Sequence, residues 1–222
     1  MSTRRLFFAL WPEEPMREAL AAAVGGAIAA MHGCRPVPLA NLHVTLAFLG
    51  AVPEAALGAL TELAGEVSRR PALAHPAPGP TDAVGGMPAD HGHGQLAHSA
   101  LEIQLDTIEH WRRAEILCAA ASRMPAAAEE LSRTLRTTLL AGGFHPDLKP
   151  FRAHVTLARH IRRAPRDLGM PVVTWSFDEF ALIESRTHPE GPTYSVVDSW
   201  VLGGGMSQPP SSRPSHPAPD RS

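Results

Sequence analysis

The chain has 222 residues, of which 44% are hydrophobic and 19% charged, and its formal net charge is −2. A chain of this length and composition can form one domain, or one of two similar lobes, without a disulfide or structural metal. The slightly negative charge argues against broad coating of nucleic acid, and two distant cysteines argue against a disulfide scaffold and for a reducing cytoplasm. No apolar run suits a signal peptide or a membrane span, so no membrane association is expected.

Hydrophobic periodicity and turn residues divide the chain into a series of expected elements. The first half is expected to hold a strand, a helix, a strand closed by Gly50 and a second helix, at residues 4–10, 13–31, 41–49 and 53–70. Residues 71–98 are rich in Pro, Gly and His and are expected to form an irregular loop. The second half is expected to hold two strands, a helix and three strands, at residues 100–106, 115–121, 125–141, 151–159, 175–184 and 194–202.

This order of elements favours an α+β fold. Because one short motif recurs in each half, we expect a two-lobed, duplicated fold in which two antiparallel sheets line a central cleft with helices outside them. Residues 1–203 are expected to form this single domain, and residues 204–222, rich in Pro and Ser, a disordered tail.

The recurring motif is the run HVTLA, which occurs at residues 43–47 and again at residues 154–158. Alternate side chains of a strand share a face, so the His and Thr of each run point one way and the Val and Leu the other. The apolar face can pack under helices, which leaves the His and Thr free to line a cleft. A duplication without catalysis would preserve the apolar face and gives no reason to keep His and Thr opposite it.

Two imidazoles that meet in one cleft suit acid–base chemistry, because one ring can be neutral and the other protonated near neutral pH. We therefore take His43 and His154 as the candidate catalytic residues and expect a bell-shaped pH profile with limbs near neutrality. Thr45 and Thr156 are candidate phosphate-binding residues, since hydroxyls donate hydrogen bonds to phosphate oxygens. The chain has no GxSxG motif and no Cys beside a His, so water is the expected attacking group, and no metal or other cofactor is expected.

The two motifs resemble the HxTx motifs of the two-histidine (2H) phosphoesterase superfamily. The similarity is strongest to its bacterial branch of RNA 2′,3′-cyclic phosphodiesterases, also described as 2′-5′ RNA ligase-like. It extends to the segments around the motifs and to the first and last expected strands, at residues 5–10, 41–50, 150–152, 158–159 and 185–186 and at Tyr194. The resemblance therefore covers most of residues 4–202.

The resemblance implies that the chain is a hydrolase that opens the 2′,3′-cyclic phosphodiester of RNA or of a nucleotide, a step of RNA processing. It further implies that His43 donates a proton to the leaving oxygen and that His154 is the proton acceptor that activates water. The implied product is a 2′-phosphomonoester. We expect a cytoplasmic, monomeric enzyme with no obligate protein partner.

Several further residues are candidates for substrate binding. Phe48, Arg152 and Arg186 are candidates for setting the direction of the ribose, and Arg159 and Tyr194 belong to the segments that carry the resemblance. Two alternatives remain open: the reverse reaction, which joins a cyclic end to a 5′-hydroxyl by the same histidines, and a module that binds RNA ends without turnover. The natural substrate also stays open among tRNA fragments, oligonucleotides, nucleoside cyclic phosphates and ADP-ribose cyclic phosphates.

Overall fold

The computed structural model describes residues 2–29, 31, 33–70, 101–164, 168–189 and 191–203, and the structural statements below refer to these residues. The expected irregular loop at residues 71–98 and the expected tail at residues 204–222 lie outside them.

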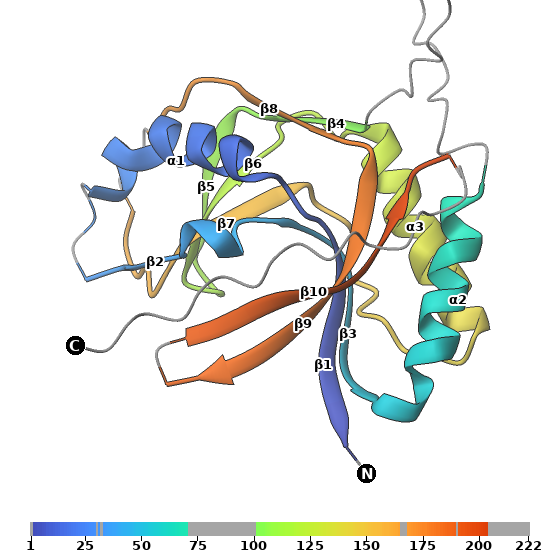
Figure 1. The fold of residues 1–222 in the computed structure, drawn as a ribbon. Coiled ribbons are helices and arrows are strands. Elements are labelled where there is room, and N and C mark those ends of the chain that lie inside the picture. The colour runs from blue at the N-terminus through green and yellow to red at the C-terminus, as the bar shows by residue number, and fades with distance from the viewer. Residues whose placement is uncertain are drawn as a thin grey trace, which may run out of the picture.

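The described residues form ten strands and three α-helices (Figure 1). The helices are α1 (Glu14–Ala29), α2 (Leu57–Ser68) and α3 (Ala126–Ala141). The strands of the first half are β1 (Thr3–Leu10), β2 (Arg35–Pro36) and β3 (Val44–Pro53). Those of the second half are β4 (Leu101–Leu105), β5 (Thr107–Trp111), β6 (Ile116–Ala120), β7 (His154–Arg159), β8 (Val173–Phe177), β9 (Glu179–His188) and β10 (Gly191–Val201).

Two four-stranded antiparallel sheets dominate the fold. One has the order β10-β9-β1-β3, and the other has the order β2-β7-β6-β5. Helices α2 and α3 lie side by side on one flank of the molecule, while α1 lies on the other side, against β8 (Figure 1). The expected α+β fold with two antiparallel sheets is thus confirmed, and each sheet carries one copy of the recurring motif, on β3 and on β7.

The buried side chains explain how the motif strands are held. Val44 and Leu46 on β3 and Val155 on β7 are fully buried, while the His and Thr beside them stay half-buried, as strand alternation predicts. Helix α3 is fixed to β3 by a hydrogen bond from the Ser132 hydroxyl, itself buried, to the backbone oxygen of Leu46 at 2.7 Å. The apolar faces of both motif strands therefore belong to the core, and the other faces are left for a site.

A second, small apolar cluster lies on the opposite face of the first sheet. It contains Phe7, Ala9, Ala181 and Ile183 of β1 and β9. The partly buried aromatic side chains that pack on this cluster are Trp11, Phe48 and Tyr194. The central strands of this sheet are therefore buried on both faces, and the aromatic layer borders the space beside His43.

The structure differs from the expected elements in several places. Gly50 does not close the strand, because β3 continues to Pro53 through an irregularity of the pairing at Gly50, whose φ of 72° suits glycine. The expected strand at residues 175–184 is two strands, β8 and β9, which lie in different sheets, and β8 pairs with β4 in a third sheet of two strands. Strands β2 and β5 were not expected. Helix α2 begins at Leu57, after a short 3₁₀ turn at Glu54–Ala56.

Candidate active site

His43 lies immediately before β3, and both of its ring nitrogens have polar partners. Its Nδ1 is 2.7 Å from the backbone oxygen of Asn41, and its Nε2 is 3.1 Å from the Thr45 hydroxyl. A backbone oxygen only accepts, so Nδ1 carries the hydrogen, and Nε2 is the nitrogen that is free to exchange a proton with a substrate.

Aromatic side chains surround the His43 ring on several sides. Its centroid lies 4.9 Å from that of Phe7, 5.5 Å from that of Trp11 in a stacked arrangement, and 5.3 Å from that of Tyr194 at a right angle. These rings fix the plane of the imidazole and cover part of its surface. The expected candidate Tyr194 is therefore in direct contact with the first motif.

His154 is the first residue of β7, and its ring is held by the same kinds of contact as that of His43, made with different residues. Its Nδ1 is 2.7 Å from the backbone oxygen of Arg152, and its ring centroid lies 4.4 Å from that of Trp111 on β5. The Trp111 indole donates a hydrogen bond of 2.6 Å to the Glu109 carboxylate, which also accepts from the Arg152 guanidinium at 2.8 Å. A connected group of three side chains thus supports the His154 ring.

Three of the four motif residues line one cavity. His43 and Thr45 reach it from β3, and Thr156 reaches it from β7; the cavity has a volume of about 530 Å³. His154 is not among its lining residues, but its charged form would lie near enough to His43 to lower the pKa of that ring. The hydroxyls of both motifs and the first histidine therefore line one cavity, whereas His154, which was expected to meet His43 in the same cleft, is not part of its lining.

Burial changes the proton affinity of both histidines. It lowers the pKa of His43 to about 4, against the opposing effect of the hydrogen bond to the Asn41 carbonyl. It also lowers the pKa of His154, where the Arg152 carbonyl and the Glu109 carboxylate oppose the fall. Both rings are therefore neutral in the free protein at neutral pH, and only the pKa of His154 is raised by a nearby carboxylate, that of Glu109.

The other expected candidates divide into two groups. Phe48, Arg159 and Tyr194 line the same cavity as the motif residues. Arg152 and Arg186 do not line it: Arg152 pairs with Glu109 at 2.8 Å, and Arg186 pairs with the buried carboxylate of Glu184 at 3.2 Å. The sequence prediction that Arg152 and Arg186 orient the ribose therefore finds no support in their position.

The sequence prediction of catalytic and binding residues left out several residues of the site. Trp11 directly follows the first strand. An aromatic residue at the end of a strand was the available sign that this side chain could border the site. Arg5 lies on β1 with its guanidinium 4.8 Å above the Phe48 ring. Trp111 and Glu109 lie on β5, a strand that was not expected, and no pattern placed Glu109 beside the second motif.

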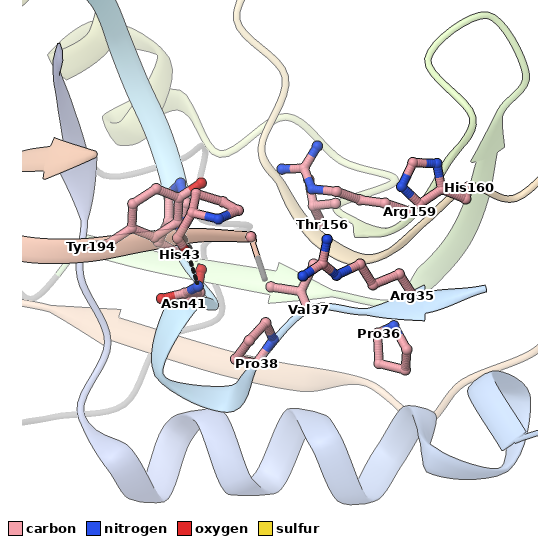
Figure 2. Close-up of a pocket in the computed structure, with 12 residues that line it drawn as sticks. Arg35, Pro36, Val37, Pro38, Asn41, His43, Thr156, Arg159, His160 and Tyr194 are labelled. Atoms are coloured by element: carbon pink, nitrogen blue, oxygen red, sulfur yellow. Dashed lines mark hydrogen bonds between the residues drawn. The ribbon is translucent and has the colours of Figure 1, made fainter. Parts of the chain in front are cut away.

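A second, smaller cavity adjoins His43 and Thr156. It has a volume of about 70 Å³, and its further lining includes Arg35 and Arg159 (Figure 2). Figure 2 also shows the hydrogen bond between His43 and Asn41 at the edge of this cavity.

The described ranges contain neither a metal-binding cluster nor a membrane-spanning helix. No three His, Cys, Asp or Glu side chains among these residues form a group that could hold a metal ion. None of the described helices is long and apolar enough to cross a membrane. The histidines at residues 75, 91, 93 and 98 lie outside the described part of the chain.

Comparisons with known proteins agree with this arrangement. The family model described as LigT like phosphoesterase matches residues 10–75. An RNA 2′,3′-cyclic phosphodiesterase of Thermus thermophilus is 32% identical over 203 residues, which are 90% of this chain and 91% of that protein. An RNA 2′,3′-cyclic phosphodiesterase of Escherichia coli K12 is 28% identical over 76% of this chain and 80% of its own length.

The fold also matches solved structures. The structure of Escherichia coli LigT complexed with 3′-AMP superposes with a TM-score of 0.68 and 25% identity, and the match covers 91% of this chain and all of that chain. Sequence and structural similarity therefore extend over nearly the whole length of the described chain.

Proposed function

This chain belongs to the LigT-like phosphoesterase family of RNA 2′,3′-cyclic phosphodiesterases, and we propose on that premise that it hydrolyses 2′,3′-cyclic phosphates. Its substrate is the end of an RNA or a nucleotide, which fits the binding of 3′-AMP by Escherichia coli LigT. The enzyme is an RNA 2′,3′-cyclic phosphodiesterase, a hydrolase of the 2H phosphoesterase superfamily.

The observation that carries the proposal is the equivalent tethering of two histidines on two sheets. In each motif, Nδ1 donates to the backbone oxygen two residues earlier at 2.7 Å, from His43 to Asn41 and from His154 to Arg152. Each imidazole therefore has its Nε2 available for proton exchange. Such a pair of oriented rings is what concerted acid–base catalysis requires.

The proposed step uses one histidine on each side of the phosphorus. Nε2 of His154 takes a proton from water, and the water oxygen forms a bond to phosphorus. The bond from phosphorus to the ribose 3′-oxygen breaks, and Nε2 of protonated His43 gives its proton to that oxygen. The product is a 2′-phosphomonoester that carries the second proton of the water on its new hydroxyl. The histidines reset when His154 gives the proton that it took to solvent and His43 takes one up.

The environments of the two rings suit these roles. A donor of lower pKa releases its proton more readily, and His43, with its pKa of about 4, is the weaker base. The hydroxyls of Thr45 and Thr156 line the cavity and donate hydrogen bonds to the non-bridging phosphate oxygens in the bound state. The bound phosphate anion raises the pKa of both histidines, so the protonated form of His43 is populated in the complex.

We further propose that residues 1–203 form the catalytic unit and that the enzyme acts in the cytoplasm as a monomer. Both cysteines, Cys34 and Cys118, are free, which suits a reducing compartment.

Incubation with an oligonucleotide ending in a 2′,3′-cyclic phosphate tests the proposed activity. Loss of the cyclic phosphate with gain of a 2′-phosphomonoester supports it, and an unchanged substrate in the presence of folded enzyme contradicts it.

A further inference from the structure

The cleft beside His43 has two arms of different size and lining. Both arms share His43, Thr156, Arg159 and Tyr194, and Arg35 lines only the smaller one. The larger arm, of about 530 Å³, continues past the aromatic rings of Phe7 and Phe48. The smaller arm, of about 70 Å³, continues toward β2. A water molecule needs roughly 10–15 Å³ of such space, so the smaller arm holds a group of a few heavy atoms.

The smaller arm is positively charged. Arg35 on β2 and Arg159 on β7 are paired residues of adjacent antiparallel strands, and both line this arm. Figure 2 shows the two side chains extending in the same direction, toward the side on which His43 and Tyr194 lie. No carboxylate is present among the described residues that line the arm. Two adjacent guanidinium groups in such a space suit a phosphate.

The backbone opposite Arg35 also favours this position of its side chain. Gly191, at the start of β10, has a φ of 121°, and an added Cβ would lie 2.8 Å from Nη2 of Arg35. A side chain there would meet both backbone strain and the guanidinium. The glycine therefore lets the start of β10 approach Arg35 and form one wall of the small arm.

The chemistry of an RNA end matches the two arms. The cyclic phosphate joins the 2′- and 3′-oxygens of the terminal ribose, while the base and the 5′-oxygen are attached to other carbons of that ribose. With the cyclic phosphate between the histidines, the larger aromatic arm has room for a base. The smaller arginine arm has room for the phosphate on the 5′-oxygen.

We propose that Arg35, with Arg159 beside it, binds the phosphodiester on the 5′ side of the terminal nucleotide. This inference rests on the proposed function and names the substrate class: an oligonucleotide with a 2′,3′-cyclic phosphate, in preference to a lone nucleoside 2′,3′-cyclic phosphate. Arg35 contributes to binding of the longer substrate and does not take part in the chemical step.

The test compares two substrates that differ only in the 5′ phosphodiester. One is uridine 2′,3′-cyclic phosphate, and the other is a dinucleotide that ends in the same cyclic uridylate. The variant is Arg35→Gln, and the matched control is Arg123→Gln, which removes an exposed arginine outside both arms. Steady-state kcat/KM is measured for both substrates across a range of salt concentrations.

The expected result is a fall of about 10-fold in kcat/KM for the dinucleotide in Arg35→Gln, as expected for one charge-assisted hydrogen bond to an exposed arginine. Turnover of the mononucleotide stays within about twofold of wild type, which also shows that the variant is folded. The log–log salt dependence for the dinucleotide becomes shallower by about 0.7, the value for one phosphate contact on a single strand.

Two results overturn the inference. Equal losses on both substrates would mean that Arg35 supports the fold or the chemistry, and no loss on either would mean that the 5′ phosphate lies elsewhere. Arg123→Gln should resemble wild type, and a loss equal to that of Arg35→Gln would assign the effect to overall charge. Failure of the wild-type enzyme on both substrates would instead refute the proposed function itself.

Discussion

Glu109 gives the most specific test of how the second motif is supported. Its carboxylate accepts hydrogen bonds from the Trp111 indole at 2.6 Å and from Arg152 at 2.8 Å, and Trp111 packs on the His154 ring. Glu109→Ala removes both contacts. Glu109→Gln keeps an amide oxygen for the indole but removes the charge, so the pair of variants separates geometry from electrostatics.

The stability cost follows from the exposure of these side chains. The ion pair is 54% exposed at Arg152 and 29% exposed at Glu109, so it contributes about 0.2–1 kcal/mol. The bond from Trp111 involves a charged acceptor, and in this partly exposed position it contributes about 1 kcal/mol. Glu109→Ala should therefore lower the free energy of unfolding by about 1–2 kcal/mol, or the melting temperature by roughly 2–8 °C. Glu109→Gln should cost about half as much.

The catalytic effect is expected in the pH profile. The histidines titrate as a pair, and the alkaline limb of kcat/KM follows the more basic ring, His154. The Glu109 carboxylate raises the pKa of that ring and so opposes the effect of burial. A screened charge pair of about 0.2–1 kcal/mol corresponds to about 0.2–0.7 pH units. The alkaline limb of Glu109→Gln should therefore move to lower pH by this amount, while its maximum changes less than about 10-fold. A loss of activity with unchanged limbs would refute the electrostatic role of Glu109.

Further predictions concern the motif residues and the medium. His43→Ala and His154→Ala should each lower kcat at least about 100-fold, and Thr45→Val and Thr156→Val about 10-fold, in steady-state assays of variants with wild-type circular dichroism. The maximum of kcat/KM should lie below pH 6.5, because burial lowers both histidine pKa values, and the maximum of kcat should lie at higher pH, because the bound phosphate raises them. Activity should survive EDTA; recovery only on adding a divalent ion would contradict the metal-free mechanism.

The sequence predicted the fold and the motif strands because these depend on local patterns. A period of two places His and Thr on one face, and the identical runs at residues 43–47 and 154–158 indicate one strand in each half. The same local reasoning failed at residues 175–184, where the aromatic and aliphatic residues on the two sides of Asp178 and Glu179 were taken as one strand, although the chain changes sheet at Asp178.

The surroundings of the histidines depend on pairing between distant strands, which no local pattern reveals. Glu109 reaches the second motif through β6, because it pairs with Cys118, and Cys118 pairs with Thr156. Arg186 is diverted from the cavity by Glu184, on the same strand. The prediction of pH limbs near neutrality also left out the effect of burial on the histidine pKa values. The sequence shows which residues titrate but not how deeply their side chains are buried.

The most direct test is phosphorus NMR of an oligonucleotide that ends in a 2′,3′-cyclic phosphate, incubated in EDTA with wild-type enzyme, His43→Ala or His154→Ala. The mechanism predicts that the wild-type enzyme converts the cyclic phosphate signal to that of a 2′-phosphomonoester, while both variants leave it almost unchanged over the same period. Conversion at the wild-type rate by either folded variant would contradict a mechanism that depends on both histidines.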